Sequence, residues 1–252
     1  MIKRFFEHIE EDTEESKYKP IKSFHLKDVL NPKIWERGDI LKANIREQLL
    51  EIANDIYSNL ELTTPLTDIV LTGSLANYNY SEYSDFDLHI LFDFSLLNKD
   101  TSLVRKYCDA ITSNWNSLHD IKIDGYDVEV YLQGISDEHH STGQYSLTNN
   151  EWLVKPHKES FEPDEELIKL KASSIMDRID SIEVDFQNNE EYESLLEKIK
   201  RVFKKIKDGR KAGLSRDGEY SVENLVFKLL RRNGYIAKII DIRRESYDKK
   251  FK

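Results

Sequence analysis

Residues 71–94, LTGSLANYNYSEYSDFDLHILFDF, contain the pattern that decides the fold. Within this stretch DFDLHILF, residues 85–92, alternates, with Phe86, Leu88, Ile90 and Phe92 on one side and Asp85, Asp87 and His89 on the other. Such alternation predicts a β-strand with one buried face. Residues two apart on a strand share a face, so the Asp85 and Asp87 carboxylates point the same way. Two anions placed together repel unless a cation lies between them, and Mg²⁺ suits hard oxygen ligands of this kind.

A Gly-Ser pair lies upstream of these two aspartates. The apolar segment LTDIVLT, residues 66–72, predicts a short strand that ends at Gly73 and is followed directly by Ser74. Ten residues then separate Ser74 from Asp85. A small Gly-Ser turn lets backbone amides and one hydroxyl approach a phosphate closely. The sequence therefore predicts a phosphate-binding turn beside a pair of metal-binding carboxylates.

A hydrophobic strand, Gly-Ser, a spacer and Asp-x-Asp follow one another here. This order resembles the motif of the DNA polymerase β-like nucleotidyltransferase superfamily. The resemblance covers residues 66–135. It implies transfer of a nucleoside monophosphate from a nucleoside triphosphate, with ATP expected, to an acceptor hydroxyl, and release of pyrophosphate. It also implies that Asp85 and Asp87 hold Mg²⁺ (or Mn²⁺), and that Gly73 and Ser74 hold the outer phosphates.

The resembling family adds a third carboxylate from a later strand. YDVEVYLQ, residues 126–133, predicts such a strand with Asp127 and Glu129 on one face. We expect Glu129 to be the third metal ligand and catalytic carboxylate, because it lies inside the strand, where the sheet fixes its direction. Asp127, closer to a turn, is the alternative. The family usually has Asp here, so Glu is a departure from its pattern.

The periodicity changes along the chain and divides it into three predicted parts. We expect an N-terminal helical arm over residues 1–32, a nucleotidyltransferase-type mixed-sheet core over 33–160, and a helical, basic region over 161–252. The predicted class is α/β (α+β). Residues 33–60 predict one helix, or two joined near Gly38. Predicted C-terminal helices cover 164–184, 190–211, 221–233 and 235–247, with a loop marked by Gly209, Gly213 and Gly218.

The net charge of −10 is unevenly distributed. Residues 198–252 carry 18 Lys/Arg against 7 Asp/Glu, whereas residues 1–197 carry 19 against 40. A basic region beside an acidic body favours an anionic partner, for which we expect RNA. Lys228 and Arg232 lie four residues apart on a predicted helix and share a face. The resemblance implies that such residues bind phosphate, while an ordinary solvated helix surface is the alternative.

Composition restricts the class of protein. No apolar run approaches the roughly 20 residues of a membrane helix, so we expect a cytoplasmic protein without a membrane partner. The single cysteine, Cys108, excludes an internal disulfide and a Cys-rich zinc site. Two other functions stay open: a non-catalytic nucleotide- or nucleic-acid-binding module on the same fold, and an unrelated α/β structural protein. The acceptor could be RNA, a small molecule, a second nucleotide or a protein, and the sequence leaves open whether there is a protein partner.

Overall fold

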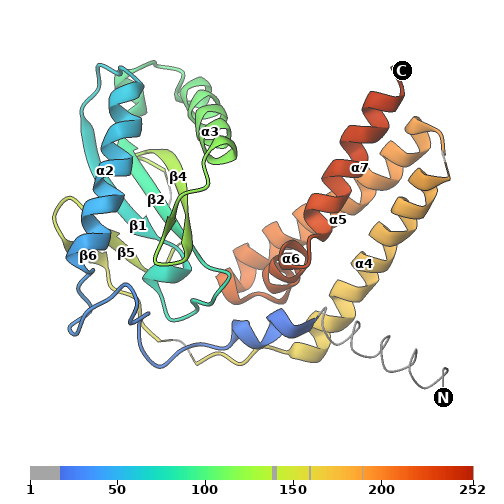
Figure 1. Cartoon of the computed structure of the whole chain (residues 1–252), viewed down its shortest axis with the longest axis horizontal. Coiled ribbons are helices and arrows are strands. Elements are labelled where there is room, and N and C mark those ends of the chain that lie inside the picture. Colours follow the sequence, from blue (N-terminus) through green and yellow to red (C-terminus); the bar gives the residue numbers. More distant parts are fainter. Residues whose placement is uncertain (1–17, 138–140, 159, 189, 252) are drawn as a thin grey trace. The chain divides into compact units, whose positions relative to one another are not determined.

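The computed structural model describes residues 18–137, 141–158, 160–188 and 190–251. The described residues form two compact units, which we call the sheet unit (Leu26–Ser160) and the helical unit (residues 18–25 and the residues from Phe161 onward; Figure 1). The predicted N-terminal arm, residues 1–32, lies only in part within the described ranges. Its last residues belong to the sheet unit and the described residues before them to the helical unit, while its first 17 residues lie outside the described ranges.

The sheet unit is mixed α/β, as the alternating segments predict. Its six-stranded sheet has the order β3-β4-β2-β1-β5-β6, in which β2 and β4 are parallel and the other neighbours antiparallel. The strands are β1 (Leu66–Thr72), β2 (Asp85–Phe92), β3 (Lys122–Ile123), β4 (Tyr126–Gly134), β5 (Gln144–Ser146) and β6 (Glu151–Val154). The helices are α2 (Ala43–Asn59) and α3 (Thr101–Leu118), with short 3-10 helices η2 (Ser74–Ala76) and η3 (Phe94–Leu96).

One face of this sheet forms the core. Phe86, Leu88, Ile90 and Phe92 of β2 are fully buried and belong to the same apolar cluster as residues of α2 and α3. The side chains that alternate with them on β2 are only half-buried. Because successive strand residues project to opposite faces, the packing of α2 and α3 on one face leaves the polar residues of β2 and β4 on the other.

The predicted helix over residues 33–60 is wrong in its first part. The helix begins only at Ala43, and before it Trp35 and Leu41 form an isolated β-bridge. Between these two residues Gly38 and Asp39 have φ values of 92° and 60°. Two consecutive left-handed residues do not fit a right-handed helix, so the chain turns here.

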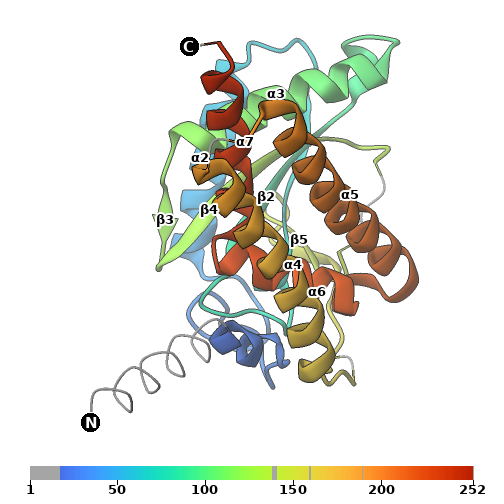
Figure 2. The same cartoon turned by 90° about the vertical axis from the view of Figure 1, so that its right-hand side faces the viewer.

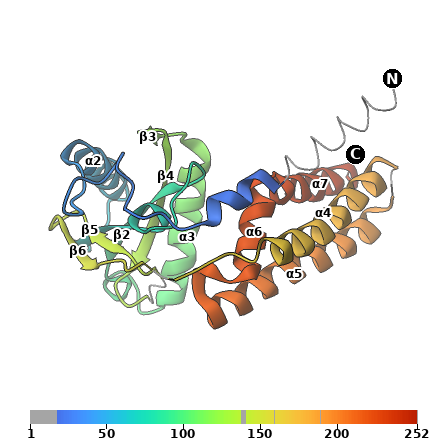
Figure 3. The same ribbon diagram turned by 90° about the horizontal axis from the view of Figure 1, so that it is seen from below.

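The helical unit contains η1 (Lys19–Phe24), α4 (Glu165–Gln187), α5 (Tyr192–Asp217), η4 (Gly218–Tyr220), α6 (Val222–Arg232) and α7 (Tyr235–Lys249). Helices α4, α5 and α7 run side by side and the shorter α6 crosses them (Figures 2 and 3). No helix in the described ranges has both the length and the apolar character needed to cross a membrane.

The predicted glycine-marked loop is also wrong, because α5 continues through Gly209 and Gly213 and ends only before Gly218. At Gly213 a Cβ would lie 2.7 Å from the Ser221 hydroxyl oxygen and 3.0 Å from Cβ of Glu223. Gly213 therefore permits the close approach of α5 and the start of α6, which is a packing role within a helix.

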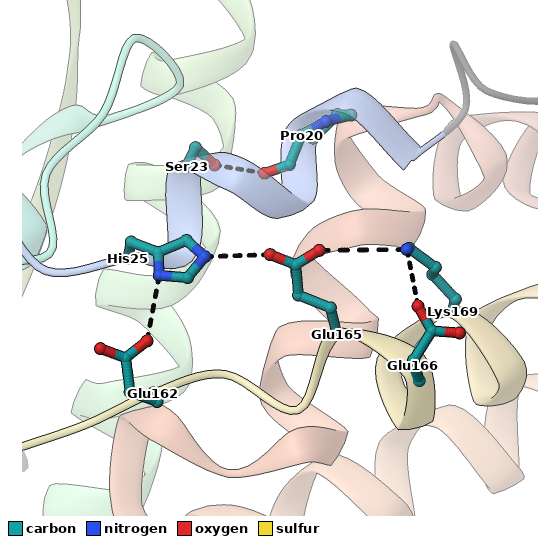
Figure 4. Close-up of polar contacts among 7 residues, drawn as sticks. All are labelled: Pro20, Ser23, His25, Glu162, Glu165, Glu166 and Lys169. Atoms are coloured by element: carbon teal, nitrogen blue, oxygen red, sulfur yellow. Dashed lines mark hydrogen bonds and ion pairs between the residues drawn. The ribbon is translucent and has the colours of Figure 1, made fainter.

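A polar cluster fastens the end of η1 to the start of α4 (Figure 4). His25 Nε2 lies 3.0 Å from Glu165 Oε1, and His25 Nδ1 lies 3.4 Å from Glu162 Oε2. Lys169 lies 3.9 Å from Glu165 and 2.9 Å from Glu166, so these two carboxylates have a cationic neighbour.

Candidate functional site

The pairing of β2 with β4 brings the predicted carboxylates to one sheet face. In the parallel register Asp85 lies opposite Asp127 and Asp87 lies opposite Glu129. Neighbouring strands are about 4.8 Å apart, and residues in register project to the same side. We call Asp85, Asp87 and Glu129 the carboxylate row. All three are half-buried.

Gly73 lies directly beside the row. Its φ of 75° and ψ of −161° fall in a region that is essentially restricted to glycine. A Cβ added to Gly73 would lie 1.7 Å from Asp87 Oδ2, so the Asp87 carboxylate rests against the turn backbone. The close contact follows from the antiparallel register of β1 and β2, in which Thr72 pairs with Asp87. The predicted turn and the predicted carboxylates are therefore one structural feature.

Ser74 connects the turn to the start of β2. Its hydroxyl donates to the Ser84 hydroxyl at 2.7 Å, and the Ser81 amide donates to the same Ser84 oxygen at 2.9 Å. On the other side of the turn, the Gly73 amide donates to the Ser141 hydroxyl at 3.4 Å. Sequence reasoning did not single out Ser84, although it immediately precedes Asp85. These hydroxyls fix the Gly-Ser turn against the end of β2 that carries the carboxylates.

The two candidates for the third carboxylate have different partners. Asp127 is 57% exposed in its side chain and forms an ion pair with Lys122, its register partner on β3. Glu129 Oε2 instead accepts a hydrogen bond from the Tyr131 hydroxyl at 2.6 Å. Lys122 neutralises Asp127 at the edge of the sheet, whereas Glu129 remains in the row beside Asp87. Of the two candidates, Glu129 is therefore the one whose carboxylate is not paired with a lysine among the described residues.

Tyr131 is a residue of this site that sequence reasoning placed on the correct face but gave no role. Burial raises the pKa of its hydroxyl, and the negative charges of Asp87, Glu129 and Asp85 raise it further. A raised pKa keeps the Tyr131 hydroxyl protonated, as its hydrogen bond to Glu129 requires. Its ring stacks on His89 with centroids 4.8 Å apart.

His89 is held in turn by a second polar contact on the same face, because its Nδ1 lies 2.5 Å from Gln133 Oε1. In the register of β2 and β4, His89 is the partner of Tyr131. The face beyond the carboxylate row is thus an ordered layer of aromatic and amide groups.

The chemistry of the row suits a hard cation, but the side chains do not form a closed cage. Among the residues that the structure describes, no three His, Cys, Asp or Glu side chains are grouped so as to hold an ion by themselves. Mg²⁺ usually keeps several waters and binds one or two carboxylates together with substrate phosphates. The row can supply ligands for that mode of binding.

Lys228 and Arg232, the predicted phosphate ligands, belong to the helical unit. Arg232 Nη1 donates to the Ser23 hydroxyl at 2.5 Å, and its guanidinium lies 4.8 Å from the Phe24 ring centroid. Arg232 therefore helps to hold η1 on α6. Lys228 is half-buried on the same helix. The carboxylate site within the sheet unit contains neither residue.

No family model matches this chain, and no curated protein or solved structure is significantly similar to it.

Proposed function

We propose that this protein is a divalent-metal-dependent nucleotidyltransferase that moves a nucleoside monophosphate from a nucleoside triphosphate, with ATP expected, to an acceptor hydroxyl. One observation carries the proposal: the β2–β4 register sets Glu129 beside Asp87, two residues along β2 from Asp85, and Asp87 rests against the Gly73 turn. Three carboxylates on rigid strands beside a glycine turn can supply oxygen ligands for a metal-bound triphosphate.

Each residue of the site has a role in this proposal. The carboxylate row would hold Mg²⁺ or Mn²⁺, which supplies charge neutralisation for the triphosphate and activation of the acceptor hydroxyl. Gly73 and Ser74 bind the outer phosphates through the turn. Tyr131 holds the Glu129 carboxylate in one orientation through its hydroxyl, so that Glu129 does not have to be ordered when the substrate binds.

The acceptor we propose is RNA, on the basis of one face of α5. Lys200, Lys204, Lys207 and Lys211 recur every three or four residues and therefore share a face, which we call the lysine face. All four are exposed, and they extend over about 16 Å of helix. Lys200 pairs with Glu197, but within the described residues the other three have no ion pair. A row of unneutralised ammonium groups matches a phosphate backbone.

The decisive experiment follows the label from the α-phosphate of each nucleoside triphosphate. The protein is incubated with Mg²⁺, one labelled triphosphate and total RNA, and the products are separated into RNA, protein and small molecules. We expect label in RNA and stoichiometric release of pyrophosphate, both absent with the Asp85→Asn variant. Label in protein or in a small molecule would replace RNA as the acceptor and retain the transfer reaction. Absence of transfer with every triphosphate would refute the proposal that this protein is a nucleotidyltransferase.

One observation favours the alternative of a non-catalytic nucleotide-binding module. Within the described residues the carboxylates are not grouped closely enough to hold an ion on their own. Calorimetric titration with Mg²⁺ and ATP separates the two functions. A binding module retains saturable ATP binding but releases no pyrophosphate, whereas the enzyme shows both.

A further inference from the structure

A groove in the helical unit lies outside the proposed catalytic site. It has a volume of about 520 Å³ and lies among α4, α5 and α6. This volume is within the range of small-molecule sites, about 300–1,000 Å³. Its walls are mostly apolar, with Ile175, Ile206, Val226, Phe227 and Leu230 among the lining residues, and Leu170 at the rim is 68% exposed.

Gly209 lines this groove from the interior of α5. A glycine inside a helix lowers stability relative to alanine, so its presence calls for a reason in the structure. At Gly213 the reason is the close approach of α6, but at Gly209 a Cβ would meet only Glu223 Cγ, at 3.8 Å. The fold therefore does not require glycine at position 209. Its missing side chain leaves the main chain of α5 open to the groove, where a ligand can approach closely.

The charges around the groove favour an anion. Three basic residues, Lys171, Lys205 and Arg210, line it with one acid, Glu223. Glu223 is already bonded to Lys171 at 2.7 Å and to Arg216 at 3.0 Å. Lys205 is exposed and has no ion pair within the described part of the chain. The acid is thus neutralised within the protein, whereas the ammonium of Lys205 is available to a ligand.

Arg210 is fixed in place at the same groove. Its Nε donates to Asn224 Oδ1 at 3.0 Å, and its guanidinium lies 4.1 Å from the Phe227 ring centroid. Asn224 is buried and donates to the Glu219 carbonyl at 2.7 Å, so Arg210 is held by an ordered polar group. A guanidinium whose position is already fixed loses little conformational entropy when it binds an anion.

We propose that this groove binds a small amphipathic anion, a long-chain carboxylate, whose chain lies along the apolar walls and crosses Gly209 while its carboxylate faces Lys205 and Arg210. The site is independent of the proposed nucleotidyltransferase reaction, since it lies wholly within the helical unit. Apolar walls alone would take any hydrocarbon chain, and the basic rim provides the preference for the acid.

The test is calorimetric titration of the full-length protein with dodecanoate, below its micelle concentration, and with dodecanol as the uncharged ligand of equal chain length. We expect dodecanoate to bind saturably and at least about tenfold more tightly than dodecanol, because the alcohol has no negative charge to pair with Lys205 and Arg210. Equal affinity for the two ligands, or no binding of dodecanoate, would overturn the proposal.

Two substitutions locate the site. Gly209→Leu places a side chain in the groove, and its Cβ would meet only Glu223 Cγ, at 3.8 Å, so we expect a folded variant that has lost dodecanoate binding. Lys205→Gln should weaken dodecanoate binding about threefold, the range of one exposed charge pair, and leave dodecanol unchanged. Lys211→Gln, on the lysine face and outside the groove lining, is the matched control. It should leave the affinities for dodecanoate and for dodecanol unchanged. Retained dodecanoate binding in a folded Gly209→Leu variant would place the ligand elsewhere and refute the site.

Discussion

The carboxylate row of the sheet unit and the lysine face of α5 both gather like charges, but they do so on different supports. Asp87 and Glu129 are in register on neighbouring strands, and short side chains on a sheet cannot move apart. The lysines carry their charges on long flexible stems that extend into water. The like charges are therefore held close together in the row and can spread apart on the helix.

This difference predicts a different response to counter-ions. Two unit charges 4 Å apart repel by about 1 kcal/mol in water and about 4 kcal/mol near a protein surface. A divalent cation at the row removes that repulsion and should stabilise the fold, whereas a polyanion at the lysine face should bind without much effect on stability. The four predictions below test this contrast.

The largest effect is expected when the row itself loses charge. Asp85→Asn and Asp87→Asn should each abolish nucleotidyl transfer, because an amide does not replace a carboxylate at a metal. Mg²⁺ should raise the melting temperature of the wild type and raise that of either variant much less, because each variant lacks one of the carboxylates that would bind the cation. Pyrophosphate release and thermal melting measure the two effects.

Asp127→Asn is the control for this pair, because Asp127 is paired with Lys122 outside the row. It should keep activity, and Mg²⁺ should raise its melting temperature as much as that of the wild type. Transfer above a tenth of the wild-type rate in both Asp85→Asn and Asp87→Asn would rule out a metal-binding function for the row.

The second prediction concerns the backbone that supports the row. Gly73→Ala would place a methyl group 1.7 Å from the present position of Asp87 Oδ2, so the carboxylate has to move. A displacement of about 1 Å in a catalytic group can cost about 100-fold in rate, and we expect a loss of that size. Gly218→Ala is the matched control, since Gly218 has a similar φ of 64° and ψ of −151° with no atom within 4 Å of a Cβ. Both variants share the backbone strain, so equal activity in the two would contradict a steric role for Gly73.

The sequence predicts the sheet of this molecule better than its turns. The strands β2 and β4 follow from strict alternation, because a buried apolar face imposes a period of two that is visible in the residues. The conformation of residues 33–42 could not be read in the same way, since apolar residues near Gly38 fit a helix as well as a bridge. The course of α5 through Gly209 and Gly213 depends on its packing with α6, and this contact is not encoded in local spacing.

The candidate site was only partly predictable for a related reason. Motif spacing indicated Gly73, Asp85 and Asp87, and strand position favoured Glu129 over Asp127. The pairing of β2 directly with β4 is a property of the sheet order, which single-strand patterns do not determine. Without that order neither the ion pair of Asp127 with Lys122 nor the hydrogen bond from Tyr131 to Glu129 could be inferred.

The third prediction sharpens the role of rigidity in the row. Tyr131→Phe keeps the ring that stacks on His89 and removes the hydroxyl that binds Glu129. Loss of a group that orients a metal ligand typically weakens metal binding at least about tenfold, and we expect this for Mn²⁺ measured by calorimetry. The activity of Tyr131→Phe should recover in part at saturating metal. A variant that had lost its fold would not recover. Tyr57→Phe, which removes a hydroxyl bound to the Thr64 carbonyl at 2.6 Å elsewhere in the sheet unit, should leave Mn²⁺ affinity unchanged.

The smallest effect is expected on the lysine face, where charge is not held rigidly. Replacing Lys204, Lys207 and Lys211 by Gln should lower RNA affinity and reduce the slope of log affinity against log salt by about 0.7 for each lysine that contacts a single strand. The melting temperature should stay within about 1 °C, since exposed charges without partners contribute little to stability. Fluorescence anisotropy with a labelled single-stranded RNA at several salt concentrations gives the slope directly.

The control replaces Lys169, Lys198 and Lys238, whose ammonium groups already lie within 2.9 Å of carboxylate oxygens of the helical unit. That variant should melt lower and keep the salt slope, because its charges are engaged within the protein. If both triple variants change the slope equally, RNA responds only to net charge and the lysine face is an ordinary solvated surface. If neither changes it while RNA still binds, the phosphates contact another part of the molecule.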